Sequence, residues 1–182
     1  IRYIVKNSQF KIELKIFNDM LKFSLPLIFA EISGIILTIS DRYSLNFLST
    51  ASEVGIYSLG FKIANTTRVF LYSSVMLAVS PMIYSYIDKP NNKRFYSKLL
   101  TYFAFGVMIF TLVLSLFAEN LVYILAEDES YWSAINLVPI ISFAILFGTL
   151  KDIILTGLNI TKKTLIIAVV VILMAALNIL LN

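Results

Sequence analysis

Two basic side chains, Lys62 and Arg68, lie six positions apart within one long apolar segment, with Asn65 between them. A charged side chain at membrane depth costs about 2.5–3.5 kcal/mol on insertion scales, so such residues usually serve a function. Arginine binds phosphate oxygens through its planar fork of donors, and lysine supplies a compact positive charge. The pair therefore predicts a binding site for an anion.

On a helical wheel, eight polar side chains of the second segment fall within an arc of roughly 160°, which is typical of a helix that lines a cavity. They are Ser58, Lys62, Asn65, Thr66, Arg68, Tyr72, Ser73 and Ser80. In the preceding apolar segment, Glu31 and Arg42 align on one face. Our candidate substrate-binding residues are Lys62, Arg68, Asn65, Glu31 and Arg42. The alternative is that Lys62 pairs with Glu31, and that Arg68 forms a packing ion pair or extends to an interface.

Two further charged pairs have simpler interpretations. Lys151 and Asp152 lie about two turns before the charged boundary at Lys162-Lys163, within reach of the interface. Asp41 and Arg42 are expected to close a hairpin by pairing with each other. Lys151 and Asp152 are therefore not among the candidate site residues, whereas Arg42 remains one of them.

The sequence offers no catalytic constellation. Histidine and cysteine are absent, and no glycine-rich phosphate loop is present. The acidic run Glu127-Asp128-Glu129 is expected to be a solvated face. We therefore predict a protein that is not an enzyme, with no cofactor, no metal ion and no nucleic-acid partner.

The elements that must position these residues are membrane spans. Of 182 residues, 59% are hydrophobic, and the mean hydropathy is +0.85, whereas soluble domains are roughly 45–50% apolar. We predict an all-α, polytopic transmembrane helix bundle over residues 23–182, preceded by a basic interfacial segment over residues 1–22. About five spans are expected, at residues 20–40, 54–87, 99–118, 133–159 and 164–181.

Local signals set the expected boundaries. The sequence Ser40-Asp41-Arg42-Tyr43 predicts a hairpin between the first two spans, and Ser52 is a candidate N-cap for the second. Pro26 is expected in the first turns of its helix, where a missing N–H costs little. Pro81 is the expected break in the long second helix. A polar loop is predicted over residues 88–98, and an acidic segment over residues 119–132.

Lysine and arginine alternate between the two sides of this bundle. The N-terminal tail holds five, the loop over residues 88–98 holds four, and the turn at Lys162-Lys163 holds two. Arg42 is the single basic residue in the connections on the other side. By the positive-inside rule, the N-terminus is cytoplasmic and the last span ends outside. The start at Ile1 and the odd number of spans also predict that this chain is a fragment of a longer protein.

Four sequence segments resemble the C-terminal half of bacterial oligosaccharide-lipid flippases, in the multidrug/oligosaccharidyl-lipid/polysaccharide exporter superfamily. The resemblance follows the chain in order and includes Ser40-Asp41-Arg42-Tyr43. The segments are Leu21–Leu27, Ser40–Tyr43 with Asn46–Leu48, Val54–Ala64, and Thr161–Thr164 with Ala176–Ile179.

The resemblance implies a two-bundle transporter in the bacterial inner membrane, of which this chain would form helices seven to eleven. The implied activity is transfer of undecaprenyl-diphosphate-linked oligosaccharide to the outer leaflet by alternating access, for cell-surface polysaccharide such as O-antigen. The implied partners are this anionic lipid, the bilayer and an N-terminal helix bundle. It also implies a basic cavity for the diphosphate, which agrees with Lys62 and Arg68.

Two other functions stay open. A multidrug cation exporter of the same superfamily calls for acidic or aromatic lining, whereas this polar stripe is net basic. A non-transporting membrane scaffold would have polar faces that are dry and fully paired within the bundle.

Overall fold

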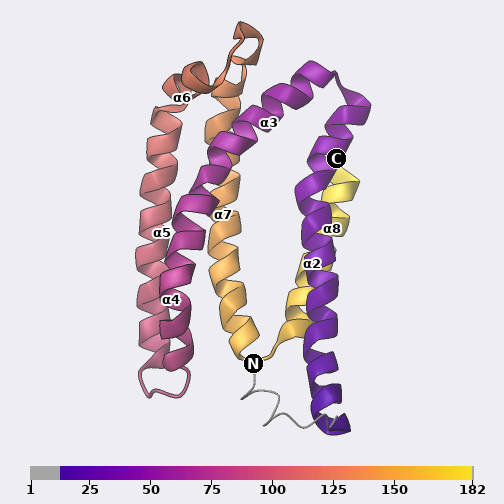
Figure 1. Cartoon of the computed structure of the whole chain (residues 1–182), viewed down its shortest axis with the longest axis vertical. Helices are drawn as coiled ribbons and strands as arrows, with labels where there is room; N and C mark the ends of the chain where they lie inside the picture. Colours follow the sequence, from indigo (N-terminus) through magenta and orange to yellow (C-terminus); the bar gives the residue numbers. More distant parts are fainter. Residues whose placement is uncertain (1–12, 182) are drawn as a thin grey trace, which may run out of the picture.

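The computed structural model describes residues 13–181, and these residues are helical apart from short connections (Figure 1). Five helices are long and apolar enough to cross a membrane. They are α2 (Leu14–Leu48), a continuous helix made of α3 (Ala51–Thr66), η1 (Thr67–Ser73) and α4 (Ser74–Ser85), α5 (Asn92–Leu116), α7 (Ala134–Ile160) and α8 (Thr164–Leu181). The predicted all-α polytopic bundle of about five spans is confirmed. A short helix, α6 (Ala118–Leu125), and a 3₁₀ turn, η2 (Glu129–Tyr131), complete the described chain.

The helices form two groups, each with an apolar core of its own. In the first group, α8 lies along α2 and buries Ala30 against Ile167, Ala168 and Val171. In the second group, α3, η1 and α4 pack with α5, α6 and α7 (Figure 1). Its cores contain Ile63, Ala118, Val122, Ala134 and Val138 near α6, and Phe103, Val107 and Leu146 farther along α5 and α7.

The two groups are joined at opposite ends of the molecule. At one end, α2 passes to α3 through Ser49 and Thr50, and at the other end α7 passes to α8 through residues 161–163 (Figure 1). Lys162 has a left-handed backbone with a φ of 55°, and the N–H of Lys163 donates to the carbonyl of Leu158 at 2.9 Å. This is the hydrogen-bond pattern of a Schellman helix end. The predicted turn at Lys162-Lys163 is therefore observed.

The predicted hairpin at Ser40-Asp41-Arg42-Tyr43 is wrong. Helix α2 continues through these residues to Leu48, because apolar residues follow Arg42 and the Asp41 carboxylate finds hydrogen-bond partners on α3 and α8 instead of solvent. The N-cap of α3 is Thr50, whose hydroxyl accepts a hydrogen bond from the N–H of Glu53 at 3.4 Å. The expectation of Ser52 at that position was two residues too late.

Both proline expectations also need correction. Pro26 lies well inside α2, since the helix begins at Leu14, and it removes one backbone hydrogen bond there. Pro81 lies within α4, which continues to Ser85. The irregular part of this long helix is η1, a π-helical segment over Thr67–Ser73. A π-helical segment carries an i→i+5 pattern and is often found at functional sites.

The polar connections are shorter than predicted. Helix α5 begins at Asn92, because the Asn92 side chain donates to the carbonyl of Ile87 at 2.7 Å and Phe95 stacks on Tyr86 at 4.2 Å. The acidic segment contains α6, and its Asp128 accepts a hydrogen bond from the N–H of Ser130 at 2.8 Å to start η2. Residues 14–22 form the first turns of α2, while residues 1–12 of the predicted interfacial segment lie outside the described residues.

Candidate functional site

A polar cavity of about 580 Å³ lies between the two helix groups. Its walls come from α2 and α8 on one side, and from α3, η1 and α7 on the other. The polar residues on its walls are Glu31, Thr38, Asn65, Arg68, Lys151, Asp152 and Asn159. We call this space the central cavity. It brings together three of the five predicted site residues, Glu31, Asn65 and Arg68.

Arg68 occupies the middle of the continuous helix over Ala51–Ser85. It is 17 residues from Ala51 (68 − 51) and 17 from Ser85 (85 − 68), about 25 Å from each end at roughly 1.5 Å per residue. It lies in the π-helical segment η1, where the hydroxyl of Ser73 donates to the Arg68 carbonyl at 3.3 Å. Its guanidinium lies 5.9 Å from the ring centroid of Tyr72. The arginine is therefore held at the middle of its helix while its side chain remains 48% exposed.

The Arg68 guanidinium donates to the Asp152 carboxylate on α7 at 2.5 Å. Asp152 also lies 3.3 Å from the ammonium of its neighbour Lys151, and its side chain is 11% exposed. The expectation that Lys151 and Asp152 serve only to reach the interface is wrong for Asp152. Asp152 is the acidic partner of the candidate arginine, so the alternative in which Arg68 forms an ion pair is confirmed. The signal was present in the sequence, because Asp152 and Asn159 share one face of the fourth predicted span.

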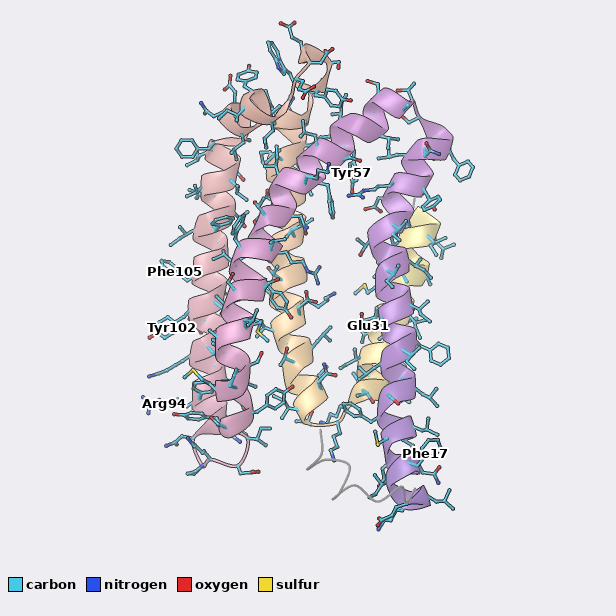
Figure 2. All side chains as sticks on the ribbon, viewed as in Figure 1. Phe17, Glu31, Tyr57, Arg94, Tyr102 and Phe105 are labelled. Carbon is cyan, nitrogen blue, oxygen red and sulfur yellow. The ribbon has the colours of Figure 1, made fainter. Side chains whose placement is uncertain are left out.

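Glu31 lies at the middle of α2, 17 residues from Leu14 (31 − 14) and 17 from Leu48 (48 − 31). Figure 2 shows it on the side of α2 that faces α7, and it lines the central cavity. The alternative in which Glu31 neutralises Lys62 is wrong, because the ion pairs among residues 13–181 join Asp152 to Arg68 and to Lys151. The cavity wall therefore carries two carboxylates, Glu31 and Asp152, and two cations. The basic cavity that the resemblance implies is therefore corrected to a charge-balanced one, although the polar stripe of residues 58–80 itself carries cations and no carboxylate.

Lys62 lines a different space. It faces a cavity of about 390 Å³ beside α6 and η2, together with Ser58, Glu127 and Tyr131. We call this space the outer pocket. Six residues at roughly 100° each leave Lys62 and Arg68 about 120° apart around the helix. An arc that wide covers two neighbouring surfaces, so the single polar stripe of the sequence is divided between two spaces.

Arg42 lies near the end of the central cavity and does not line it. Its guanidinium carbon is 4.8 Å from the ring centroid of Phe61, which does line the cavity. The neighbouring Asp41 accepts hydrogen bonds from the Tyr57 hydroxyl at 3.1 Å and from the Asn178 amide at 3.4 Å. Figure 2 shows Tyr57 on the side of α3 that faces α2. These contacts join α2, α3 and α8 near the Ser49-Thr50 link.

The two ends of the bundle differ in charge. Arg94 and Phe17 lie at the same end (Figure 2), which also carries the basic turn at Lys162-Lys163 (Figure 1). The opposite end carries the acidic residues of α6 and η2. There the backbone N–H and the hydroxyl of Ser130 hold the pKa of Asp128 below its usual value. Burial and the nearby carboxylate of Glu119 raise the pKa of Tyr123.

The chemistry available in the central cavity is recognition of charge. Arg68 supplies a donor fork, Lys151 a second cation, and the Asn65 and Asn159 side chains neutral amides. Among the described residues, no group of three or more histidine, cysteine, aspartate or glutamate side chains is arranged to hold a metal ion. The polar side chains on the cavity wall can bind and orient an anion, and Arg68 can exchange its ion pair with Asp152 for one with a ligand.

Residues 1–87 match a family described as "Polysaccharide biosynthesis protein". The matched part contains α2, α3, η1 and α4, and with them Glu31, Asn65 and Arg68. Lys151, Asp152 and Asn159 on α7 lie beyond it. Comparison with curated proteins and with solved structures gives no match.

Proposed function

We propose that this multi-pass membrane protein, whose residues 1–87 match the polysaccharide biosynthesis protein family, transports undecaprenyl-diphosphate-linked oligosaccharide. The direction would be from the cytoplasmic to the outer leaflet of the bacterial inner membrane, in cell-surface polysaccharide biosynthesis. The observation that carries the proposal is Arg68, half-exposed to a cavity at the middle of its helix.

The diphosphate group is the part of the substrate that the central cavity fits. Its oxygens would accept hydrogen bonds from the Arg68 fork and the Lys151 ammonium, with Asn65 and Asn159 as neutral donors. To bind, it must displace the Asp152 carboxylate from Arg68. A diphosphate carries more negative charge than one carboxylate, which favours the exchange. When no substrate is bound, the Asp152 carboxylate accepts the hydrogen bond from Arg68.

The two helix groups support a mechanism of alternating access. Because they are joined at opposite ends and enclose the cavity between them, a rocking of one group against the other would open the cavity at alternate ends. The positive-inside rule would place the end with Arg94 and Lys162-Lys163 in the cytoplasm. A further N-terminal helix bundle would provide the facing half of the transport path.

A second candidate function is export of an organic cation. It is favoured by Glu31, a carboxylate at mid-length of α2 on the cavity wall, and by the Phe61 ring on the same wall. A non-transporting scaffold is less well supported, because its polar faces would be dry and Arg68 is 48% exposed.

The test is transport by the full-length protein in proteoliposomes, with fluorescent undecaprenyl-diphosphate oligosaccharide and an organic cation dye as alternative substrates. We expect flipping of the lipid-linked sugar and a loss of about tenfold in Arg68→Lys, which keeps the charge but removes the planar fork. Glu31→Gln is expected to change the flipping rate less than Arg68→Lys. Dye export that is abolished by Glu31→Gln, without any flipping, would establish the second candidate instead.

A further inference from the structure

A third space, almost wholly apolar, lies between α7 and α8. It has a volume of about 440 Å³, and Lys151 is the one polar residue among those that line it. The apolar residues are Phe147, Leu150, Ile154, Leu155, Leu158, Ile166, Ile167 and Val170. We call this space the α7–α8 groove.

The groove exists because α7 and α8 belong to different helix groups. The turn at residues 161–163 joins them, but α8 then follows α2 while α7 stays with α3 and α5 (Figure 1). The groove is open toward the surroundings of the bundle, since Phe147 and Ile154 on α7 are 59% and 56% exposed.

The groove continues from the central cavity. Lys151, Leu155 and Ile167 line both spaces. Lys151 lies where they meet, with its ammonium 3.3 Å from Asp152 and its side chain 53% exposed. The charged central cavity is therefore continuous with the apolar groove, and Lys151 lies at the boundary between them.

We propose that the α7–α8 groove holds the isoprenoid chain of the lipid substrate while its diphosphate lies in the central cavity. The inference rests on the proposed function and adds the place of the lipid tail and a role for Lys151. An amphiphile with an anionic head needs an anion site adjoining an apolar path, and these two spaces provide that order. Lys151 would bind the phosphate nearest the chain.

The groove contributes mainly by guiding the chain. A lipid tail leaves one apolar medium for another, so packing and shape decide the preference more than removal from water does. Filling the groove should therefore weaken binding of a long-chain diphosphate, while a diphosphate too short to enter the groove should bind as before.

The experiment compares two diphosphates, undecaprenyl diphosphate and dimethylallyl diphosphate, which carry the same head on a long and a short chain. Binding is measured to the full-length protein in phosphatidylcholine nanodiscs. The test variants are Ile154→Trp and Val170→Trp, singly and together, which fill the groove from α7 and from α8. The matched controls are Ile140→Trp and Val169→Trp, exposed residues of the same types on the same helices that line neither space.

We expect the double groove variant to bind undecaprenyl diphosphate about tenfold more weakly and dimethylallyl diphosphate unchanged. Unchanged binding of the short diphosphate also shows that the variant is folded. Lys151→Met should weaken both probes, and the control variants neither.

Three results would overturn the inference. Equal binding of the long diphosphate by the groove and control variants would remove the groove from the substrate path and leave the proposed function intact. A phosphatidylglycerol probe that loses affinity in the groove variants by the same factor would identify a general phospholipid groove. A wild-type protein that binds neither diphosphate would overturn both this inference and the proposed function.

Discussion

Lys62 and Arg68 lie on one continuous helix, yet their surroundings differ in every respect that matters for binding. Arg68 lies in a π-helical segment, contacts Asp152 on another helix and lines the space between the two helix groups. Lys62 lies in regular α-helix and lines the outer pocket beside Glu127. The helix therefore carries two polar surfaces, only one of which faces the interface between the two helix groups.

The two cations would also respond differently to the proposed rocking of the helix groups. Asp152 belongs to α7, in the same group as Arg68, so without substrate their ion pair would persist during the proposed rocking motion while the cavity wall contributed by α2 and α8 changes. The outer pocket lies wholly within the second group, between α3 and the α6–η2 region. A ligand in the central cavity would contact both groups, whereas one in the outer pocket would contact one.

The largest expected effect contrasts the two cations directly. We expect Arg68→Ala to reduce flipping of the lipid-linked oligosaccharide by about tenfold to a hundredfold, as for loss of a charge-assisted hydrogen bond. Lys62→Ala, an equal truncation of a cation on the same helix, should stay within about threefold of wild type. The rates are measured in proteoliposomes with matched protein content. Equal losses in the two variants would mean that the outer pocket belongs to the transport path.

The next effect tests whether Asp152 competes with the substrate. Asp152→Asn removes the charge that holds Arg68 but keeps the shape of the side chain. Binding of dimethylallyl diphosphate should become about threefold to tenfold tighter, because the anion no longer displaces a carboxylate. Asp128→Asn, the same change at the acidic end, is the control and should leave affinity unchanged. Weaker binding in Asp152→Asn would show that the carboxylate positions Arg68 rather than competing for it.

Much of the fold followed from hydropathy, because spans of membrane length are specified by runs of apolar residues that need no tertiary information. The exact ends of the helices did not follow from hydropathy. Asp41 and Arg42 indicated a hairpin, but Tyr57 and Asn178 provide partners that let α2 continue, and such partners come from distant parts of the chain. Positive-inside orientation stays a prediction.

The sequence predicts only part of the candidate site, because residue type and position select candidates but the contacts between helices depend on packing. Arg68, Asn65 and Glu31 were selected from position and type, and the cavity unites them. The sequence assigns Asp152 to the interface, because the residue lies close to Lys162-Lys163 along the chain and its partner Arg68 is revealed only by packing. The sequence assigns Lys62 and Arg68 to one site because a helical wheel gives the angle of each side chain around the helix. It does not show which neighbouring helix each side chain faces.

A smaller effect concerns the contact between Arg42 and Phe61 at the end of the central cavity. Phe61→Leu keeps an apolar side chain but removes the ring face, so we expect the free energy of unfolding to fall by about 1 kcal/mol. Phe70→Leu is the matched control, because Phe70 lies on the adjoining η1 segment and is 64% exposed. The measurement is thermal or denaturant unfolding in one detergent. A similar change in both variants would assign the loss to ring packing in general.

The smallest effect lies at the acidic end, next to the outer pocket, and depends on pH. The pKa of Asp128 is lowered in the folded protein by hydrogen bonds from Ser130, so this carboxylate stabilises η2 above its unfolded-state pKa. The stabilisation is lost as the pH falls through the lowered folded-state pKa. Amide hydrogen exchange at Ser130, corrected for the intrinsic pH dependence, should therefore gain protection as pH rises through this acidic range in wild type and not in Asp128→Ala. If Asp128→Ala also altered flipping as much as Arg68→Ala, η2 and the outer pocket would have to be included in the transport path, and the distinction between the two cations would no longer hold.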